Sequence, residues 1–135
     1  LDLLMTHIVE PRLAEQGACF VYDYPASQAA LSRIVEVDGT RVGQRFELYV
    51  DGMELANGYY ELTDADEQRA RFEADNALRR ERGQEERPID EALLAAMQSG
   101  LPECSGVALG LDRLLMLSVD AKSVAEVLTF DWRSS

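Results

Sequence analysis

The sequence has few residues of the kinds that hold metals or cross-link chains, with two cysteines and one histidine among 135 residues. Cys19 and Cys104 are far apart and form no Cys-x-x-Cys pair, so a structural zinc site is not expected. We expect two buried free thiols in a reducing compartment. His7 falls among apolar residues of a predicted helix and is not expected to act as a metal ligand or a base.

The start of the chain lacks a basic segment followed by a long apolar run. Neither a signal peptide nor a membrane span is therefore expected, which predicts a cytoplasmic protein with no membrane partner. The chain also has no initiator Met and begins at Leu1 inside a predicted helix, so we expect it to be a fragment of a longer protein.

Positive charge is scarce, because 13 Lys and Arg residues face 25 Asp and Glu residues and the formal net charge is -12. Phosphate contacts need clustered cations, so this composition does not favour a nucleic-acid partner. The arginines between Arg69 and Arg87 are interleaved with acidic residues, which is typical of a solvated helix with paired charges. With 47% hydrophobic residues, the chain can still form a core.

A β-hairpin is the clearest element of the predicted fold. Residues 43–50 alternate, with Phe46, Leu48 and Val50 on one face and Arg45, Glu47 and Tyr49 on the other. Asp51-Gly52 suits a tight turn, from which a second strand would return over residues 53–62. Strands joined by hairpins predict an α+β fold with an antiparallel sheet flanked by helices, in one domain over residues 1–135.

Helix signals are found on both sides of this hairpin. We expect a helix over residues 1–16, in which Pro11 makes a kink or begins a second turn, and helices from Thr63 or Asp64 to about Arg82 and from Pro88 to Gly100. After the glycine segment we expect a helix that contains Leu111, Leu114, Leu115 and Leu117. A short helix and strand are expected from Val124 to Phe130.

The segment Glu54-Leu55-Ala56-Asn57-Gly58-Tyr59-Tyr60-Glu61-Leu62 places two carboxylates and a carboxamide close together. Asn57-Gly58 could be a second hairpin turn, or a bulge in one continuous strand. In a continuous strand Asn57, Tyr59 and Glu61 share a face, and a bulge brings Glu54 to that face as well. Two carboxylates on one face repel unless a cation lies near them, and Mg²⁺ or a substrate ammonium would serve.

The segment Gly106-Val107-Ala108-Leu109-Gly110-Leu111-Asp112-Arg113 precedes and opens a predicted helix. Glycines before a helix let backbone N–H groups approach an anion, and Arg113 could point back toward a phosphate. The alternative is a glycine-rich packing contact between a strand and a helix.

These segments, in this order, resemble the C-terminal half of the catalytic domain of class II lysyl-tRNA synthetases and their truncated paralogues. The matching segments are Arg45 to Tyr49, Glu54 to Leu62, Asp64 to Gln68, and Gly106 to Arg113, which is similar to the third signature motif of the class. The resemblance covers nearly all of the chain and implies an antiparallel sheet flanked by helices.

Within this family, three places resemble the paralogues that modify a protein, elongation factor P, in place of tRNA. They are Tyr24 to Leu31, Pro102 to Gly106, and Ala108, which stands where the synthetases carry Gly. An extra methyl in a pocket wall contributes roughly 1 kcal/mol to discrimination, enough to alter which lysine isomer fits. The resemblance therefore implies lysine or β-lysine as substrate, elongation factor P as acceptor, and no tRNA partner.

The resemblance also implies a role for each residue that matches the family pattern. Glu54, with the Leu55 backbone, would face ATP and Mg²⁺, and Glu54 and Glu61 are the implied metal-binding carboxylates. Asn57, Tyr59, Glu61 and Ala108 would line the lysine pocket, where Glu61 meets an ammonium. Gly110 and Arg113 would contact the nucleotide, with Arg113 near the γ-phosphate, and Arg113 and Glu54 are the implied catalytic pair.

The first two signature motifs of the family, which carry the dimer helix and an ATP-binding Arg, would lie upstream of this chain. The chain alone is therefore expected to be inactive and to expose apolar surface, and the longer parent is expected to be a homodimer. A fragment of a lysyl-tRNA synthetase and an inactive synthetase-like binding protein are the alternatives.

Overall fold

The computed structural model describes residues 2–130, which form two compact units. The first contains the described residues up to Tyr24, residues 45–58 and the described residues from Val107 onward. The second contains residues 25–44 and 59–106. No helix in the described part of the chain is both long and apolar enough to span a bilayer.

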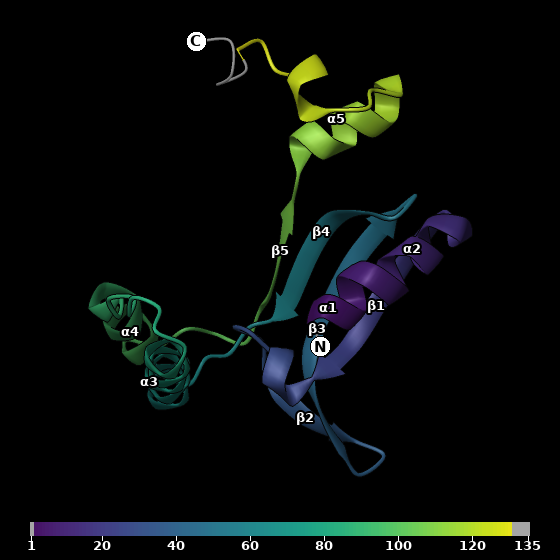
Figure 1. The fold of residues 1–135 in the computed structure, drawn as a ribbon. Helices are drawn as coiled ribbons and strands as arrows, with labels where there is room; N and C mark the ends of the chain where they lie inside the picture. Colours follow the sequence, from purple (N-terminus) through teal and green to yellow (C-terminus); the bar gives the residue numbers. More distant parts are fainter. Residues whose placement is uncertain (1, 131–135) are drawn as a thin grey trace. The chain divides into compact units, whose positions relative to one another are not determined.

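Five strands form one sheet in the order β1-β3-β4-β5, and β2 also pairs with β3 (Figure 1). The strands are β1 (Ala18–Pro25), β2 (Ile34–Val37), β3 (Thr40–Val50), β4 (Met53–Tyr60) and β5 (Ser105–Leu109). β2 and β3 are antiparallel, with register pairs from Ile34 and Gly43 to Val37 and Thr40. The predicted α+β class with an antiparallel sheet is confirmed.

The predicted turn between β3 and β4 is also confirmed, because Asp51 and Gly52 have φ values of 50° and 79°. β4 then continues through Asn57-Gly58 without a turn, so of the two alternatives the continuous strand is correct. It ends at Tyr60, two residues earlier than expected, and Glu61 forms an isolated antiparallel bridge with Ser32.

The N-terminal helical segment combines several helix types: α1 (Asp2–Leu4), a π-helical turn (Met5–Val9), α2 (Glu10–Leu13) and a 3₁₀ turn (Ala14–Gln16). Pro11 lies in the first turn of α2, where its missing N–H is tolerated. The Glu10 N–H donates to the Met5 carbonyl, five residues back, which closes the wider turn before the proline. The predicted disturbance at Pro11 is thus a change of helix type.

Two helices, α3 (Ala65–Glu81) and α4 (Glu91–Gln98), contact each other in the second unit (Figure 1). Asp64 caps α3 by accepting from the N–H groups of Asp66 and Glu67, both at 2.9 Å. α3 ends before Gly83, whose φ is 67°. Exposed ion pairs such as Arg80–Glu86 at 2.8 Å confirm the predicted solvated, charge-paired helix.

Some predicted boundaries are wrong. α4 begins at Glu91 and not at Pro88, because the Asp90 carboxylate caps the Leu93 N–H at 2.9 Å. The helix expected after the glycine segment is confirmed as α5 (Leu111–Val119), which follows Gly110, while Gly106 lies in β5. The end of the described chain has a 3₁₀ turn (Val124–Glu126), and no strand follows it up to residue 130.

Each unit has its own buried apolar residues. In the first unit they are Tyr24, Tyr49, Leu55, Ala56 and Met116, and in the second Ala29, Val42, Leu62, Leu94 and Met97. The predicted exposed apolar surface is found on α5, at Leu111, Leu114, Leu115 and Val119. Cys19 and Cys104 are free, as predicted, but are half-buried and not fully buried.

Candidate functional site

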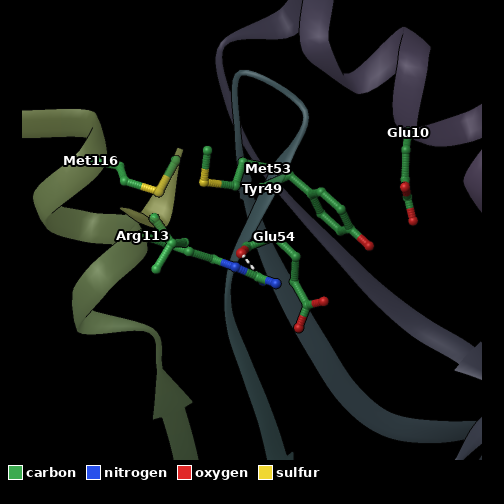
Figure 2. A pocket seen from close by; sticks show the side chains of 7 residues that line it. Glu10, Tyr49, Met53, Glu54, Arg113 and Met116 are labelled. Atoms are coloured by element: carbon green, nitrogen blue, oxygen red, sulfur yellow. Dashed lines mark hydrogen bonds between the residues drawn. The ribbon is translucent and has the colours of Figure 1, made fainter. Parts of the chain in front are cut away.

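A cavity of about 340 Å³ opens in the first unit (Figure 2). It is lined by Glu10, Tyr49, Met53, Glu54, Arg113, Met116 and Val124. Two of these, Glu54 and Arg113, are residues to which sequence analysis assigned nucleotide contacts. The cavity therefore has two acidic groups, a guanidinium and apolar side chains in its walls, the mixture expected of a small-molecule site.

Two hydrogen bonds connect β4 to the start of α5. The Arg113 Nη1 donates to the Glu54 carbonyl oxygen at 2.6 Å (Figure 2), and the Gly110 N–H donates to the Leu55 carbonyl at 2.9 Å. Glu54 stands close after the β3–β4 turn, and Arg113 lies in the first turn of α5. The four residues with predicted nucleotide roles, Glu54, Leu55, Gly110 and Arg113, are thus brought together.

A buried carboxylate, Glu47, lies in the same unit and is 6% exposed. It accepts hydrogen bonds from the Tyr24 hydroxyl at 2.6 Å, the Tyr49 hydroxyl at 2.7 Å and the Asn57 amide at 3.3 Å, and it pairs with Arg45. The Arg45 guanidinium also stacks 4.5 Å from the centroid of the Tyr24 ring. Four donors converge on one carboxylate, which fixes its position and balances the cost of its burial.

Sequence analysis missed Glu47, although it placed Arg45, Glu47 and Tyr49 on one face of β3. The available signal was that face itself, since an acid flanked at period two by an arginine and a tyrosine has partners of the right kind within reach. Asn57, which was expected to line a lysine pocket, donates to Glu47 and accepts from the Arg45 Nε, both at 3.3 Å.

The environment of Glu54 disfavours a negative charge on its carboxyl group, because that group is partly buried and the Glu47 carboxylate is already charged nearby. Burial raises the pKa of Glu54, repulsion by Glu47 raises it further, and the Arg113 charge opposes both. Burial, followed by hydrogen bonding to Glu47, strongly raises the pKa of Tyr24 and Tyr49. Both phenols therefore stay protonated and act as donors, and the site would gain stability from a cation near Glu54.

A hard divalent cation such as Mg²⁺ matches this donor set, because it prefers carboxylate oxygens. Among residues 2–130 there is no cluster of three or more Asp, Glu, His or Cys side chains arranged to hold a metal. Glu54 and Glu10 are the carboxylates that line the cavity, whereas both oxygens of the buried Glu47 already accept hydrogen bonds from other side chains. Mg²⁺ usually completes its shell with water and substrate phosphate. The carboxylates that line the cavity are oxygen donors of the kind that Mg²⁺ prefers.

The remaining predicted residues occupy β4 and β5. Ala108 is exposed on β5 in the first unit, and Tyr59 lies near the end of β4 in the second. Glu61 follows β4 in the second unit, where its N–H donates to the Cys104 carbonyl at 2.9 Å.

Comparison with known proteins places the chain in a family. Residues 8–133 match the family model of class II tRNA synthetases for the D, K and N groups. The chain belongs to this class II synthetase family.

The chain is also similar to individual proteins of narrower description than the family. The chain is 55% identical over 130 residues to the elongation factor P–(R)-β-lysine ligase of Pectobacterium atrosepticum. It is 54% identical to proteins of the same name in Klebsiella pneumoniae and Salmonella gallinarum. Each alignment covers 96% of this chain and 40% of the relative, so the chain spans less than half the length of the relatives that it matches.

Proposed function

We propose that this chain is part of an ATP-dependent ligase that activates lysine or β-lysine and transfers it to a lysine side chain of elongation factor P. The observation that carries the proposal is the 55% identity, over 96% of this chain, to a protein named for that reaction. The pairing of Glu54 with Arg113 around the cavity supports it, because that cavity combines groups suited to a cation and to a phosphate.

The proposed reaction has two steps. In the first, a carboxylate oxygen of the amino acid attacks the α-phosphorus of ATP, pyrophosphate leaves, and an aminoacyl-adenylate forms. In the second, the acceptor amine attacks the acyl carbon, AMP leaves, and the amine loses a proton. Both steps depend on positioning and on charge neutralisation more than on a general base.

The chain's own residues divide between the two substrates. The nucleotide is held by Arg113, Glu54 and the backbone of Gly110 and Leu55. Mg²⁺, held through Glu54, would neutralise phosphate charge when it is bound. Glu61 remains the other proposed metal-binding carboxylate.

The amino acid is held by the second group of residues. Asn57, Tyr59, Glu61 and Ala108 are the residues proposed to contact the amino acid, and Glu61 would accept from its ammonium. We further propose that the complete enzyme is a cytoplasmic homodimer that uses elongation factor P, and not tRNA, as acceptor. The relatives' name mentions elongation factor P and (R)-β-lysine, and it does not mention tRNA.

The test uses a chimeric ligase in which this chain replaces the matching 130 residues of the P. atrosepticum relative. Elongation factor P and lysine tRNA are supplied in competition, with labelled lysine or (R)-β-lysine. We expect label on elongation factor P and none on tRNA. A folded chimera that labels tRNA, or that releases no pyrophosphate with either isomer, contradicts the proposal.

Two substitutions in the chimera test the residue roles. Glu61→Gln removes a charged hydrogen bond, about 1.5–3 kcal/mol, and should raise the KM for the amino acid roughly 10-fold to 150-fold with the KM for ATP unchanged. Arg113→Ala should lower kcat/KM for ATP on the order of 100-fold. The matched controls are Glu73→Gln and Asp112→Asn, both at exposed positions. Equal losses for both substrates in Glu61→Gln would exclude its ammonium role.

A further inference from the structure

Glu61 and Gly106 lie against each other within the second unit. A Cβ placed on Gly106 would collide with the Oε1 of Glu61 and would lie 3.5 Å from its Cδ. Both atoms belong to the end of a flexible side chain. An added methyl group at Gly106 would therefore push the carboxylate aside and leave the surrounding backbone in place.

Hydrogen bonds hold the backbone of Glu61 on two sides. Its N–H donates to the Cys104 carbonyl at 2.9 Å, and the residue bridges Ser32 on the other side. The next residue, Leu62, donates its N–H to the Leu31 carbonyl, also at 2.9 Å. The carboxylate can therefore change direction only by rotation of its own side chain.

The segment before Gly106 is anchored as well. The Glu103 carboxylate accepts from the Arg33 Nη2 at 2.8 Å and from the Tyr60 hydroxyl at 3.1 Å, and the Arg33 guanidinium stacks 4.8 Å from the Tyr60 ring centroid. Hydrogen bonds from these two residues hold the pKa of Glu103 below its usual value. This cluster ties the approach to β5 to the end of β4, so Gly106 cannot easily move away from Glu61.

We propose that Gly106 is a positioning residue, whose missing side chain sets the direction of the Glu61 carboxylate and so the fit of a substrate ammonium. This inference rests on the proposed function, in which Glu61 binds that ammonium. Backbone strain is not the reason for glycine here, since φ at Gly106 lies outside the left-handed region. Alanine is therefore compatible with the backbone, and its effect falls on the carboxylate.

The test is Gly106→Ala in the chimeric ligase. A carboxylate displaced by about 1 Å should raise the KM for lysine or β-lysine on the order of 10-fold to 100-fold, with the KM for ATP unchanged. Ser105→Ala, at an exposed position on the same strand, is the control and should leave both values unchanged. An unchanged amino-acid KM in Gly106→Ala overturns the proposal.

A double-mutant cycle separates positioning from general damage. In a Glu61→Ala background there is no carboxylate to displace, so adding Gly106→Ala should cause no further rise in the amino-acid KM. An additive rise would mean that Gly106 acts by another route and would overturn the proposal.

A crystal structure of the 135-residue chain carrying Gly106→Ala gives a readout that needs no activity. We expect a rotated Glu61 side chain on an unchanged backbone, and an unmoved carboxylate overturns the proposal. If Glu61→Gln leaves the amino-acid KM unchanged, the proposed function fails, and this structure still decides whether Gly106 directs the carboxylate. If Glu61→Gln raises that KM and Gly106→Ala does not, only the positioning role fails.

Discussion

Replacing Tyr49 with Phe removes one donor from the buried Glu47 carboxylate and changes little else. Tyr49 is 3% exposed, and its hydroxyl lies 2.7 Å from the Glu47 Oε2. A hydrogen bond to a charged group contributes about 1.5–3 kcal/mol. Tyr24, Asn57 and Arg45 still donate to the same carboxylate, so the charge keeps most of its partners. We therefore expect a loss of about 1.5–2 kcal/mol in the free energy of unfolding.

Urea unfolding of the 135-residue chain, followed by far-UV circular dichroism, measures this loss. The corresponding fall in Tm is roughly 5–10 °C. Tyr22→Phe is the matched control, because Tyr22 lies on β1 as Tyr24 does but is 68% exposed. Its effect should stay within about 0.5 kcal/mol.

The interpretation of Glu47 as a shared acceptor fails if Tyr49→Phe and Tyr22→Phe have equal effects. A second test is the double variant that combines Tyr24→Phe with Tyr49→Phe. The Tyr24 and Tyr49 hydroxyls share the Oε2 atom, so Tyr24→Phe and Tyr49→Phe should be coupled by at least about 0.5 kcal/mol. Additive losses would mean that the two phenols do not act on the same group.

Three further variants test the fold and the charge of the site. The pKa of Glu54 is raised above 4.5 in the folded state, so between pH 4.5 and that pKa the native state keeps this carboxyl protonated while the unfolded state loses the proton. The free energy of unfolding therefore falls as the pH rises through this range. Glu54→Gln should remove this fall and stabilise the chain at pH 7 by about 0.5 kcal/mol, measured by urea unfolding across pH. Asp64→Ala removes the cap of α3 and should cost about 1 kcal/mol by the same assay, and no change would contradict the capping role. Gly52→Ala adds a Cβ that would lie 2.8 Å from the Ala14 Cβ, at a φ of 79°. It should destabilise by about 1–3 kcal/mol more than Gly39→Ala, where φ is 76° and the space is open, and equal melting temperatures would exclude the close contact.

Local signals in the sequence predicted the parts of the fold that local chemistry decides. Positive φ values are needed in the Asp51-Gly52 turn and at Gly83 after α3. Asp and Gly are residue types that adopt such values, so the sequence predicts both features. The Asp64 cap needs only a short carboxylate before a helix. The start of α4 was misplaced because Pro88 and Asp90 are both acceptable starts, and local sequence does not rank them.

The candidate site was only partly predictable, for a different reason. Glu54 and Arg113 stand in recognisable segments, and the structure brings them to one cavity. Glu47 has a weaker local signal, the polar face that it shares with Arg45 and Tyr49, because its burial also depends on Tyr24 from another strand. Alternation assigned it to a face of β3 but could not tell that this polar face is the buried one.

The bond from Arg113 to the Glu54 carbonyl has a consequence for how tightly an anion can be held. Fixing an arginine side chain costs about 1.5–2 kcal/mol of rotamer entropy, which a flexible arginine loses at the moment of binding. Here part of that loss already occurs on folding, because one guanidinium N–H is tethered to β4 at 2.6 Å. This hydrogen bond therefore preorganises the Arg113 guanidinium. A phosphate that binds to it loses less free energy to the ordering of the side chain, and its affinity is correspondingly higher.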